Sequence, residues 1–321
     1  MQQQQWRQSG YPKVSQANIS QGFTLIELMI ALVLGLLISA AVLQVYLSAF
    51  RTSLVQQGGS EIADASVFGI QNLERQIRLA NLGNSVFQIN QTTKFGGVVL
   101  SAQNVGLPAN DPKIPDNLMT TSADGAPPNT ASSTNSAWTG GSGTDIASDQ
   151  LTIQYQNVID AGLVDCEGNT VALNDWVIER YFIRGNGIFT CDAGRVDPAG
   201  GIKPANTTNN TPTFGNEGVA FVDNVEQFKA LLGVQSRDAN HLAYITPKNY
   251  LALPTSDPLY QAPIIAVKLG FLVRSNHVIP ESTGNEYTIF GTENTVSNQD
   301  NFLRRNYEST IMLRNARVIT P

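Results

Sequence analysis

An uninterrupted apolar run near the N-terminus constrains this chain more than any other feature. From Leu28 to Phe50 no residue carries a charge. In an α-helix, which rises about 1.5 Å per residue, such a run is long enough to cross the hydrocarbon core of a bilayer. One acid, Glu27, stands at the front edge of the run, five residues after Gly22. A charged, unpaired carboxylate is costly in hydrocarbon, so Glu27 requires a partner.

Three interpretations of this segment compete. A secretory signal peptide would have a shorter apolar core and no acid at its start. A plain membrane anchor accounts for the length and for the basic leader, because positive charge stays on the cytoplasmic side, but it does not account for Glu27. The third interpretation accounts for every feature. The string Gly22-Phe23-Thr24-Leu25-Ile26-Glu27 resembles the processing site of type IV prepilins.

That resemblance assigns roles to three residues. It implies that a prepilin peptidase cuts between Gly22 and Phe23 and methylates the new amine of Phe23. Glu27 is then the fifth residue of the mature chain, and its carboxylate forms a salt bridge with the Phe23 amine of a neighbouring subunit. An ammonium and a carboxylate that neutralise each other enter a dry helix bundle more readily than either alone. A helix dipole that favours an acid at this position is a compatible second explanation.

The helical pattern continues beyond the apolar run. Apolar residues recur at spacings of three or four, with charged residues between them, which predicts an amphipathic helix that lies on a sheet. Gly83 is the expected cap at its end. The stripe consists of Ile62, Ala65, Gly69, Leu73, Ile77 and Ala80.

The rest of the chain alternates between strand-like segments and polar stretches. Arg184–Ile188 predicts a hairpin turn, and the alternation in 264–275 predicts an edge or half-buried strand. Polar composition predicts loops at 103–149 and 192–216. The predicted strands lie at 85–101, 150–157, 176–184, 187–191, 219–234, 264–275 and 304–319.

These elements together predict an α+β fold, in which a long N-terminal helix packs on an antiparallel β-sheet with long loop insertions. We expect four parts: a leader peptide at 1–22, a transmembrane and assembly helix at 23–50, an amphipathic helix at 51–83, and a β-rich globular domain at 84–321. The stretch 103–149 is expected to be an exposed insertion in that domain.

Two cysteines, Cys166 and Cys191, are the only ones in the chain and form no CxxC motif. In a chain that leaves the cytoplasm, an isolated pair about 25 residues apart is a candidate disulfide. Closing such a loop would contribute roughly 3 kcal/mol in the chain-entropy model. Two buried free thiols are the alternative.

No motif for catalysis or for metal binding is found in the sequence. There is no G-x-S-x-G, HExxH or Walker loop, and His241 and His277 lie far apart. We therefore predict no enzyme activity, no metal and no cofactor. Acids in Asn- and Gly-rich loops are interpreted as solvated loop acids rather than Ca²⁺ ligands. They are the pairs Asp192 with Asp197 and Glu293 with Asp300.

Charge and loop composition limit the choice of partners. The net charge is −6, which argues against stable nucleic-acid binding, because phosphate contacts depend on Lys and Arg. Trp138, in a polar loop, is either a contact residue for a surface or DNA ligand or a tryptophan packed back on the domain. A basic C-terminal set is interpreted as strand-surface charge, with contact to an acidic neighbouring subunit as the alternative. Its members are Arg304, Arg305, Arg314 and Arg317.

Segments near the C-terminus narrow the resemblance. V-D-N-V-E-Q-F at 222–228, L-V-R-S at 272–275, R-R-N-Y at 304–307 and L-R-N at 313–315 resemble the PilW family of minor pilins. That family implies a lollipop-like pilin fold. The resemblance also implies the function of a minor pilin, a subunit that helps to start assembly of a type IV pilus and lies at the fibre tip. A pseudopilin of a type II secretion system is the alternative.

The same resemblance implies partners and a location. The partners are prepilin peptidase, other minor pilins, the major pilin and the inner membrane. Before assembly the protein would be a single-pass inner-membrane protein with a periplasmic C-terminal domain, and afterwards part of a pilus on the cell surface.

Overall fold

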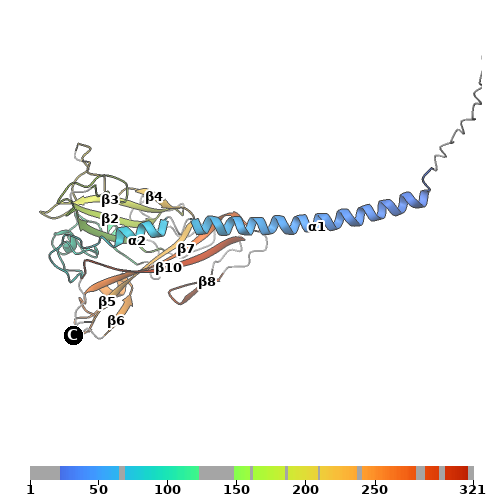
Figure 1. Cartoon of the computed structure of the whole chain (residues 1–321). Coiled ribbons are helices and arrows are strands. Elements are labelled where there is room, and N and C mark those ends of the chain that lie inside the picture. The colour runs from blue at the N-terminus through green and yellow to red at the C-terminus, as the bar shows by residue number, and fades with distance from the viewer. Residues whose placement is uncertain are drawn as a thin grey trace, which may run out of the picture. The chain divides into compact units, whose positions relative to one another are not determined.

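A computed structural model describes residues 22–64, 69–122, 148–159, 162–184, 187–208, 210–236, 241–279, 286–295 and 301–316 (Figure 1). The chain divides into two compact units, Met1–Thr52 and Ser53–Pro321, and each is described by itself. In the first unit, helix α1 (Leu25–Asp64) begins, and its large apolar side chains there are exposed. This part of the chain is rich in Leu, Ala and Met, which have high helix propensity.

The second unit contains the last turns of α1 and the short helix α2 (Gln71–Ile77). Ile62, Gly69, Leu73, Ile77 and Ala80 are all buried, which confirms the predicted amphipathic stripe at these positions. Ala65 lies outside the described residues. The regular helix ends at Ile77, earlier than the predicted end near Gly83.

The hydrogen bonds of Asn81 explain why α2 ends early. The backbone N–H of Asn81 donates to the Gln154 carbonyl (3.0 Å), and its side chain donates to the carbonyls of Val86 and Asn315 (2.9 Å each). These bonds hold Asn81 in the left-handed region at φ 67°, which is incompatible with a continuing α-helix. Gly83 follows in the same region, with φ 77°.

In the described part of the chain, ten strands form two four-stranded sheets and one hairpin. The first sheet has the order β1-β2-β3-β4, the second has the order β10-β7-β5-β6, and β8 pairs with β9. All paired strands are antiparallel. The first sheet contains β1 (Leu151–Gln156), β2 (Trp176–Ile183), β3 (Phe189–Val196) and β4 (Val219–Val222). The second contains β5 (Val225–Gln235), β6 (Leu242–Ile245), β7 (Ile264–Val278) and β10 (Phe302–Met312).

Short elements complete the unit. They are the 3₁₀ helices η2 (Ala102–Val105) and η3 (Asp116–Leu118), the helix α3 (Pro247–Leu251), and the hairpin strands β8 (Glu286–Ile289) and β9 (Thr292–Thr295).

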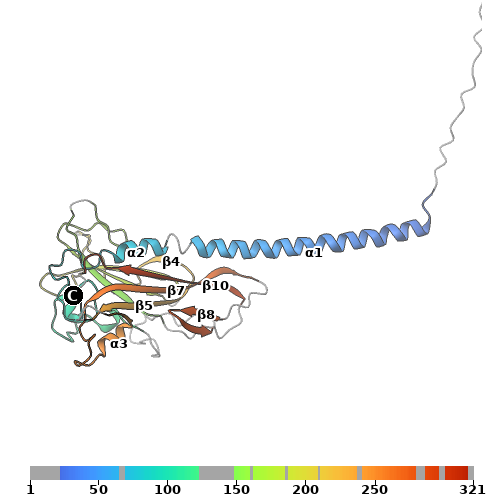
Figure 2. The same ribbon diagram turned by 60° about the horizontal axis from the view of Figure 1, so that its bottom comes forward.

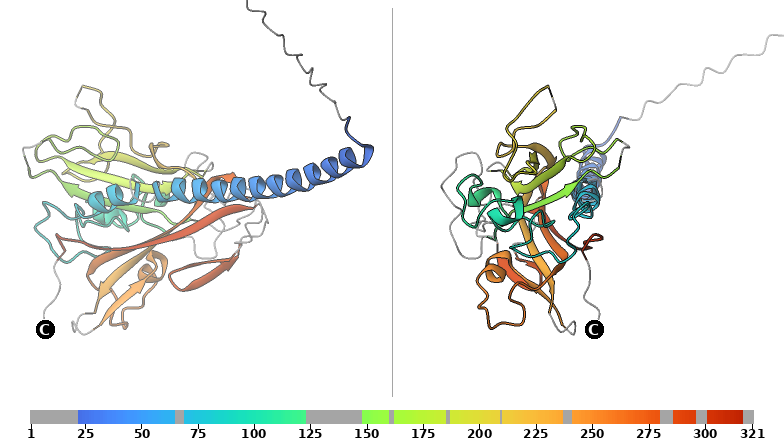
Figure 3. Two further views of the ribbon diagram at one scale, coloured as in Figure 1. Left: turned by 45° about the vertical axis from the view of Figure 1, so that its right-hand side comes forward. Right: turned by 90° about the vertical axis from the view of Figure 1, so that its left-hand side faces the viewer.

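The main core lies between the two sheets and α2. Phe189 of the first sheet meets Phe228 and Phe271 of the second, with ring centroids 4.9 and 5.2 Å apart, and Phe228 lies 5.0 Å from Phe271. Aromatic rings at such distances stabilise a core beyond the area that they bury. Leu73 and Ile77 of α2, and Ile70 directly before it, join the same cluster. Figure 2 shows α2 beside the strands, and Figure 3 shows it, in cyan, along one side of both sheets.

Most predicted strands are confirmed, but three assignments were wrong. Residues 85–101 form turns with a single bridge from Val98 to Ile153, because asparagine side chains occupy their backbone groups. For example, Asn104 binds the N–H groups of Leu100 and Ser101. Strand β3 extends to Val196, into the stretch predicted as a loop from 192. Strand β7 is central rather than at an edge, and most of it is buried on both faces.

Part of the predicted exposed insertion is a second core. Val105, Leu107, Ile114 and Met119 are buried and pack with Trp176 and its neighbours on the first sheet. The prediction of an exposed segment is therefore wrong for these buried residues, whereas most of 108–113, with Pro115 and Asp116, is exposed, as predicted. Residues 123–147, which include Trp138, lie outside the described residues.

Gly97 occupies a position that tolerates no side chain. A Cβ atom there would lie 2.3 Å from the Asn81 backbone nitrogen, and backbone cannot move aside. We expect Gly97→Ala to lower the free energy of unfolding by about 1–3 kcal/mol, measured by thermal unfolding of the detergent-solubilised chain. Gly59→Ala is the matched control: nothing lies within 4 Å of its Cβ position in α1, so that change should be neutral or stabilising. Equal unfolding midpoints for the two variants would contradict this assignment.

Candidate functional site

The first candidate site is the junction where the N-terminal segment enters α1. Gly22 and Phe23 precede the helix, whose first residue is Leu25. The Phe23 side chain is 88% exposed, and nothing lies within 4 Å of the Cβ position at Gly22. The bond between these two residues is therefore non-helical and accessible, as a peptidase substrate must be.

Thr24 and Glu27 hold the start of the helix in a reciprocal arrangement. The backbone N–H of Glu27 donates to Thr24 Oγ1 (3.2 Å), and the backbone N–H of Thr24 donates to Glu27 Oε2 (3.1 Å). The Thr24 hydroxyl also donates to Glu27 Oε2 (3.0 Å). Two backbone donors that a helix start leaves unsatisfied are bonded in this way, which is the capping-box arrangement. The sequence signal for this arrangement is the pattern Thr-x-x-Glu directly before the apolar run.

The apolar surface of α1 is the second element of the site. Within the described residues, α1 is the one helix long and apolar enough to cross a membrane. From Leu25 to Phe50 its apolar side chains are exposed, so this surface has no partner among the residues that the structure describes. Exposed apolar surface of this extent is typical of contact with lipid or with other helices.

The last turns of α1 dock on strand β7. Gly58 is buried, and a Cβ atom there would lie 2.8 Å from Ile279 Cδ1, so the absence of a side chain allows the close approach. Glu61 fixes the contact, because its Oε2 accepts a hydrogen bond from the Asn276 backbone N–H (3.2 Å). Gly58 thus serves close packing, whereas its neighbour Gly59 has no contact at its Cβ position.

The predicted disulfide is present. Cys166 and Cys191 are bonded, and their Cα atoms lie 6.2 Å apart. The bond joins the loop after β1 to strand β3. The neighbouring backbone is held as well, because the Cys166 N–H donates to Glu179 Oε1 (2.8 Å).

Glu179 of β2 is a fully buried carboxyl group beside this disulfide. Its Oε1 also accepts from the Tyr155 hydroxyl (2.8 Å), and its Oε2 accepts from the Tyr181 hydroxyl (2.7 Å). Loss of hydration raises the pKa of Glu179 to about 7, although the three hydrogen bonds oppose this rise. The same burial and the Glu179 charge raise the pKa of both tyrosines.

One member of each of two charged sets that the sequence placed on the surface lies instead in a buried ion pair, whereas Arg305 and Arg314 are exposed, as predicted. Asp192 lies in β3, and its Oδ2 is 2.7 Å from Arg180 Nη2, with both side chains fully buried. Arg304 donates from Nη2 to Glu226 Oε1 (3.0 Å) in the second sheet, and both are nearly inaccessible. The predictions of solvated loop acids at Asp192 and of strand-surface charge at Arg304 were therefore wrong.

Some of the other predicted loop acids and C-terminal arginines lie outside the described residues. Asp197 accepts a hydrogen bond from the Ala199 N–H (2.8 Å) in a turn, as a loop acid does. Asp300 and Arg317 lie outside the described residues, as does the side chain of Glu293. Among the described residues, no group of three or more His, Cys, Asp or Glu is placed to hold a metal ion.

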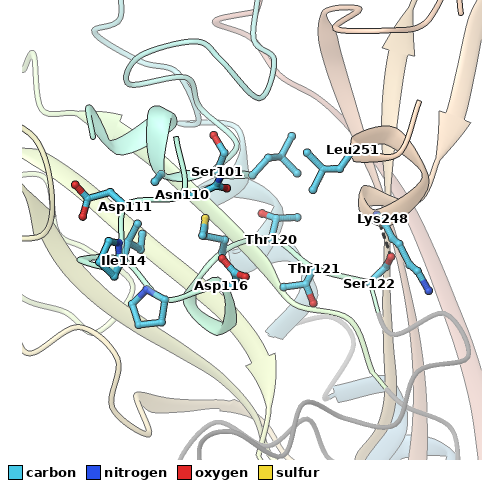
Figure 4. A pocket seen from close by; sticks show the side chains of 15 residues that line it. Ser101, Asn110, Asp111, Ile114, Asp116, Thr120, Thr121, Ser122, Lys248 and Leu251 are labelled. Carbon is cyan, nitrogen blue, oxygen red and sulfur yellow. Dashed lines mark hydrogen bonds between the residues drawn. The ribbon is translucent and has the colours of Figure 1, made fainter. Parts of the chain in front are cut away.

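A cavity of about 750 Å³ opens between residues 100–122 and helix α3 (Figure 4). Its floor is apolar, with Leu100, Ile114 and Met119. Its rim carries the carboxylates of Asp111 and Asp116 and the ammonium of Lys248. The excess of negative charge makes this cavity unsuited to the phosphates of a nucleic acid.

Comparisons with known proteins agree with the two regions singled out by the sequence. Residues 18–43 match the family described as Prokaryotic N-terminal methylation motif, and residues 201–315 match the family described as Type IV Pilus-assembly protein W. These matches confirm the resemblance to type IV pilin-like proteins and to the PilW family. They are families of structural proteins, as the prediction of a non-enzymatic chain required.

Other comparisons add little. None of the curated proteins matches the chain. Among solved structures, the type IV-like pilin TTHA1219 from Thermus thermophilus is similar, with a TM-score of 0.38 and 13% identity. The similarity covers 80% of this chain and 99% of that one.

Proposed function

On the premise that this chain carries the N-terminal methylation motif and a C-terminal region of the Type IV pilus-assembly protein W kind, we propose that it is a minor pilin of a type IV pilus. One observation carries the proposal. An exposed, non-helical Gly22–Phe23 bond stands directly before an apolar helix whose side chains from Leu25 to Phe50 are exposed in the described part of the chain. A helix of this kind is explained by insertion first in a membrane and then among other helices.

Processing defines the parts of the proposed precursor. Residues 1–22 are the leader, and prepilin peptidase cuts between Gly22 and Phe23 and methylates the Phe23 amine. Residues 23–50 then form the transmembrane and assembly helix, and 51–83 lead into the globular domain of 84–321. The N-terminal motif implies membrane anchoring before assembly. The proposal adds that this is a single pass through the inner membrane with the globular domain in the periplasm.

The proposed assembly contact is a pair of opposite charges at the start of the helix. In the mature chain, the Phe23 amine and the Glu27 carboxylate of neighbouring subunits neutralise each other and set the register of the packed helices. The proposed neighbours are other minor pilins and the major pilin. A role in starting assembly, at the tip of a fibre on the cell surface, completes the proposal. The acidic rim of the cavity and the net charge of −6 argue against DNA as the tip ligand.

A pseudopilin of a type II secretion system is the second candidate, since it would share the processing site and the helix. A clean deletion distinguishes the two when surface pili, twitching motility and secreted-enzyme activity are scored together. Loss of pili and motility with normal secretion supports the minor pilin. Normal pili with lost secretion would replace the proposal by the pseudopilin.

Glu27→Gln tests the register role in the complemented deletion strain. The amide keeps the shape of the side chain but removes its charge, so we expect normal membrane insertion and at least a tenfold loss of the protein from sheared pili, on the scale of a lost charge pair in a dry interface. Immunoblots of membrane and pilus fractions measure both quantities. Wild-type amounts of the variant in pili would show that the charge of Glu27 is not needed.

A further inference from the structure

We propose that the cavity between residues 100–122 and helix α3 is a binding site for an organic cation, that is, a positively charged amine or guanidinium carried on an apolar body. The inference concerns the globular unit and does not depend on the proposed processing or assembly. The cavity volume of about 750 Å³ lies within the range of about 300–1,000 Å³ that is usual for ligand sites. Such a cation exists in two forms, as a free amine and as the lysine or arginine side chain of a polypeptide.

The wall of the cavity that contains η3 is held in place by strand β1 and the residue before it. Gln150 donates from Nε2 to the carbonyls of Asn117 (2.8 Å) and Met119 (2.7 Å). The Thr152 hydroxyl donates to the Leu118 carbonyl (2.8 Å). A wall that is fixed in this way does not have to be ordered when a ligand enters, so the entropic cost of binding is low.

Helix α3 contributes the other wall and has an anchor of its own. The hydroxyl of the buried Tyr250 donates to the Ala262 carbonyl (2.7 Å). The Lys248 backbone N–H donates to Ser122 Oγ (3.2 Å), so a hydrogen bond joins the two walls (Figure 4). The cavity is therefore a preformed space, as most ligand sites are.

The floor of the cavity favours an apolar body. Leu100, Ile114 and Met119 line it, and all three are nearly inaccessible because other core residues pack behind them. Leu251 of α3 also lines the cavity and is 44% exposed. An apolar group that covers this exposed aliphatic surface removes it from water, which favours binding.

The charges at the rim select a cation. Asp111 and Asp116 line the cavity, and neither forms an ion pair with a described residue; Asp111 Oδ1 accepts a hydrogen bond from the Lys113 backbone N–H (2.9 Å). Lys248 is the one basic residue among the described lining residues, and it stands beside Ser122 rather than beside Asp111 (Figure 4). Two carboxylates against one ammonium leave an excess of negative charge, which attracts a cation and repels an anion.

The two features together define the ligand more closely than either does alone. An apolar floor accepts any apolar molecule, and two carboxylates attract any cation. A molecule that joins an apolar body to a positive charge satisfies both. A bare metal ion fits poorly, because leucine, isoleucine and methionine supply none of the oxygen ligands that Ca²⁺ or Mg²⁺ require. The described residues also place no group of three or more His, Cys, Asp or Glu to hold a metal ion.

The test is a nuclear magnetic resonance titration of the full chain in detergent, with isotope-labelled methionine methyl groups. Met119 reports on the cavity floor, and Met312 of β10, which does not line the cavity, reports on non-specific binding. Three probes share a phenyl ring and differ in charge: phenethylammonium, phenethyl alcohol and phenylacetate. Phenethylammonium should shift the Met119 resonance along a saturable curve with a millimolar dissociation constant, as expected of so small a ligand. Phenethyl alcohol should bind about fivefold more weakly, and phenylacetate should give no saturable shift.

Variants separate the contribution of charge from that of the apolar surface. The double variant Asp111→Asn with Asp116→Asn keeps the side-chain shapes and should weaken phenethylammonium binding about fivefold, with phenethyl alcohol unaffected. Leu251→Ala should weaken the binding of both probes alike, by about threefold. Asp197→Asn is the matched control, because Asp197 also accepts the N–H two residues further on, that of Ala199 (2.8 Å), but does not line the cavity. It should bind phenethylammonium like the unchanged chain.

A second pair of probes distinguishes the two sources of the cation. They are the acetylated and amidated tripeptides Leu-Lys-Leu and Leu-Glu-Leu, of which the second should not bind. Tighter binding of Leu-Lys-Leu than of phenethylammonium assigns the site to a polypeptide, and the reverse order assigns it to a free amine. Three results would overturn the proposal: no saturable shift at Met119, equal responses to phenethylammonium and phenylacetate, or unchanged phenethylammonium binding in the double variant. Equal shifts at Met119 and Met312 would overturn it as well, because the probe would then bind without selecting the cavity.

Discussion

Replacing both Cys166 and Cys191 by alanine is expected to lower the free energy of unfolding of the globular unit by about 3 kcal/mol, because their bond closes a loop of 25 residues in the unfolded chain. The disulfide also holds the loop that carries a hydrogen-bond donor to a buried carboxyl group. The bond ties the loop after β1 to β3 at the point where the Cys166 N–H meets the buried Glu179. A loosened loop would leave that carboxyl group with one hydrogen bond fewer.

The thermal unfolding midpoint of the detergent-solubilised chain measures this effect. For a unit of this size, a loss of about 3 kcal/mol corresponds to a fall of about 6–12 °C. Reductant should lower the midpoint of the wild-type chain by a similar amount and leave the double variant unchanged. If the midpoints of wild type and double variant coincide under oxidising conditions, the disulfide does not stabilise the fold.

The second large expected effect is a pH dependence of the free energy of unfolding that arises from Glu179. Its sign is opposite to that of most carboxyl groups. The pKa of Glu179 rises from the ordinary 4.5 to about 7 in the folded chain, chiefly through loss of hydration. Because the folded pKa lies above the unfolded one, the stabilisation is fully present below about pH 4.5 and is lost as the pH rises to about 7. A rise of 7 − 4.5 corresponds to about 3 kcal/mol.

Glu179→Gln isolates that contribution, because the amide keeps the shape and never ionises. The difference in unfolding free energy between wild type and variant should shift by about 3 kcal/mol in favour of the variant between pH 4.5 and pH 8. Denaturant unfolding at a series of pH values measures it. The nearby Asp165 also repels the Glu179 charge, but its own salt bridge to Arg195 (2.8 Å) is present in both proteins and cancels. A pH-independent difference would show that Glu179 titrates as an ordinary glutamate.

The sequence predicted most reliably what depends on local pattern. The apolar run, the amphipathic stripe and the hairpin between β2 and β3 follow from spacing alone, and the structure confirms all three. The prediction of the disulfide succeeded for a simpler reason, since two cysteines allow only one pairing.

Several of the misses share a physical cause, namely hydrogen bonds and ion pairs whose partners the pattern of a short sequence window does not reveal. Asn81 ends α2 early through bonds to Gln154 and Asn315, and neither partner is visible in a local window. The charge of a side chain also failed to show whether that side chain is exposed or buried. Asp192 and Arg304 were assigned to the surface, yet each is buried beside a counter-charge on another strand. A polar residue in a sequence reveals that it needs a partner but not whether that partner is water.

The most direct test of the account is the N-terminus of the protein recovered from its own cells. Mass spectrometry of the membrane and pilus fractions should find a mature chain that begins at Phe23 with a methylated amine. An intact leader would contradict the account. So would a chain that has lost the apolar run, since that would identify the run as a cleaved signal peptide and leave no helix for assembly.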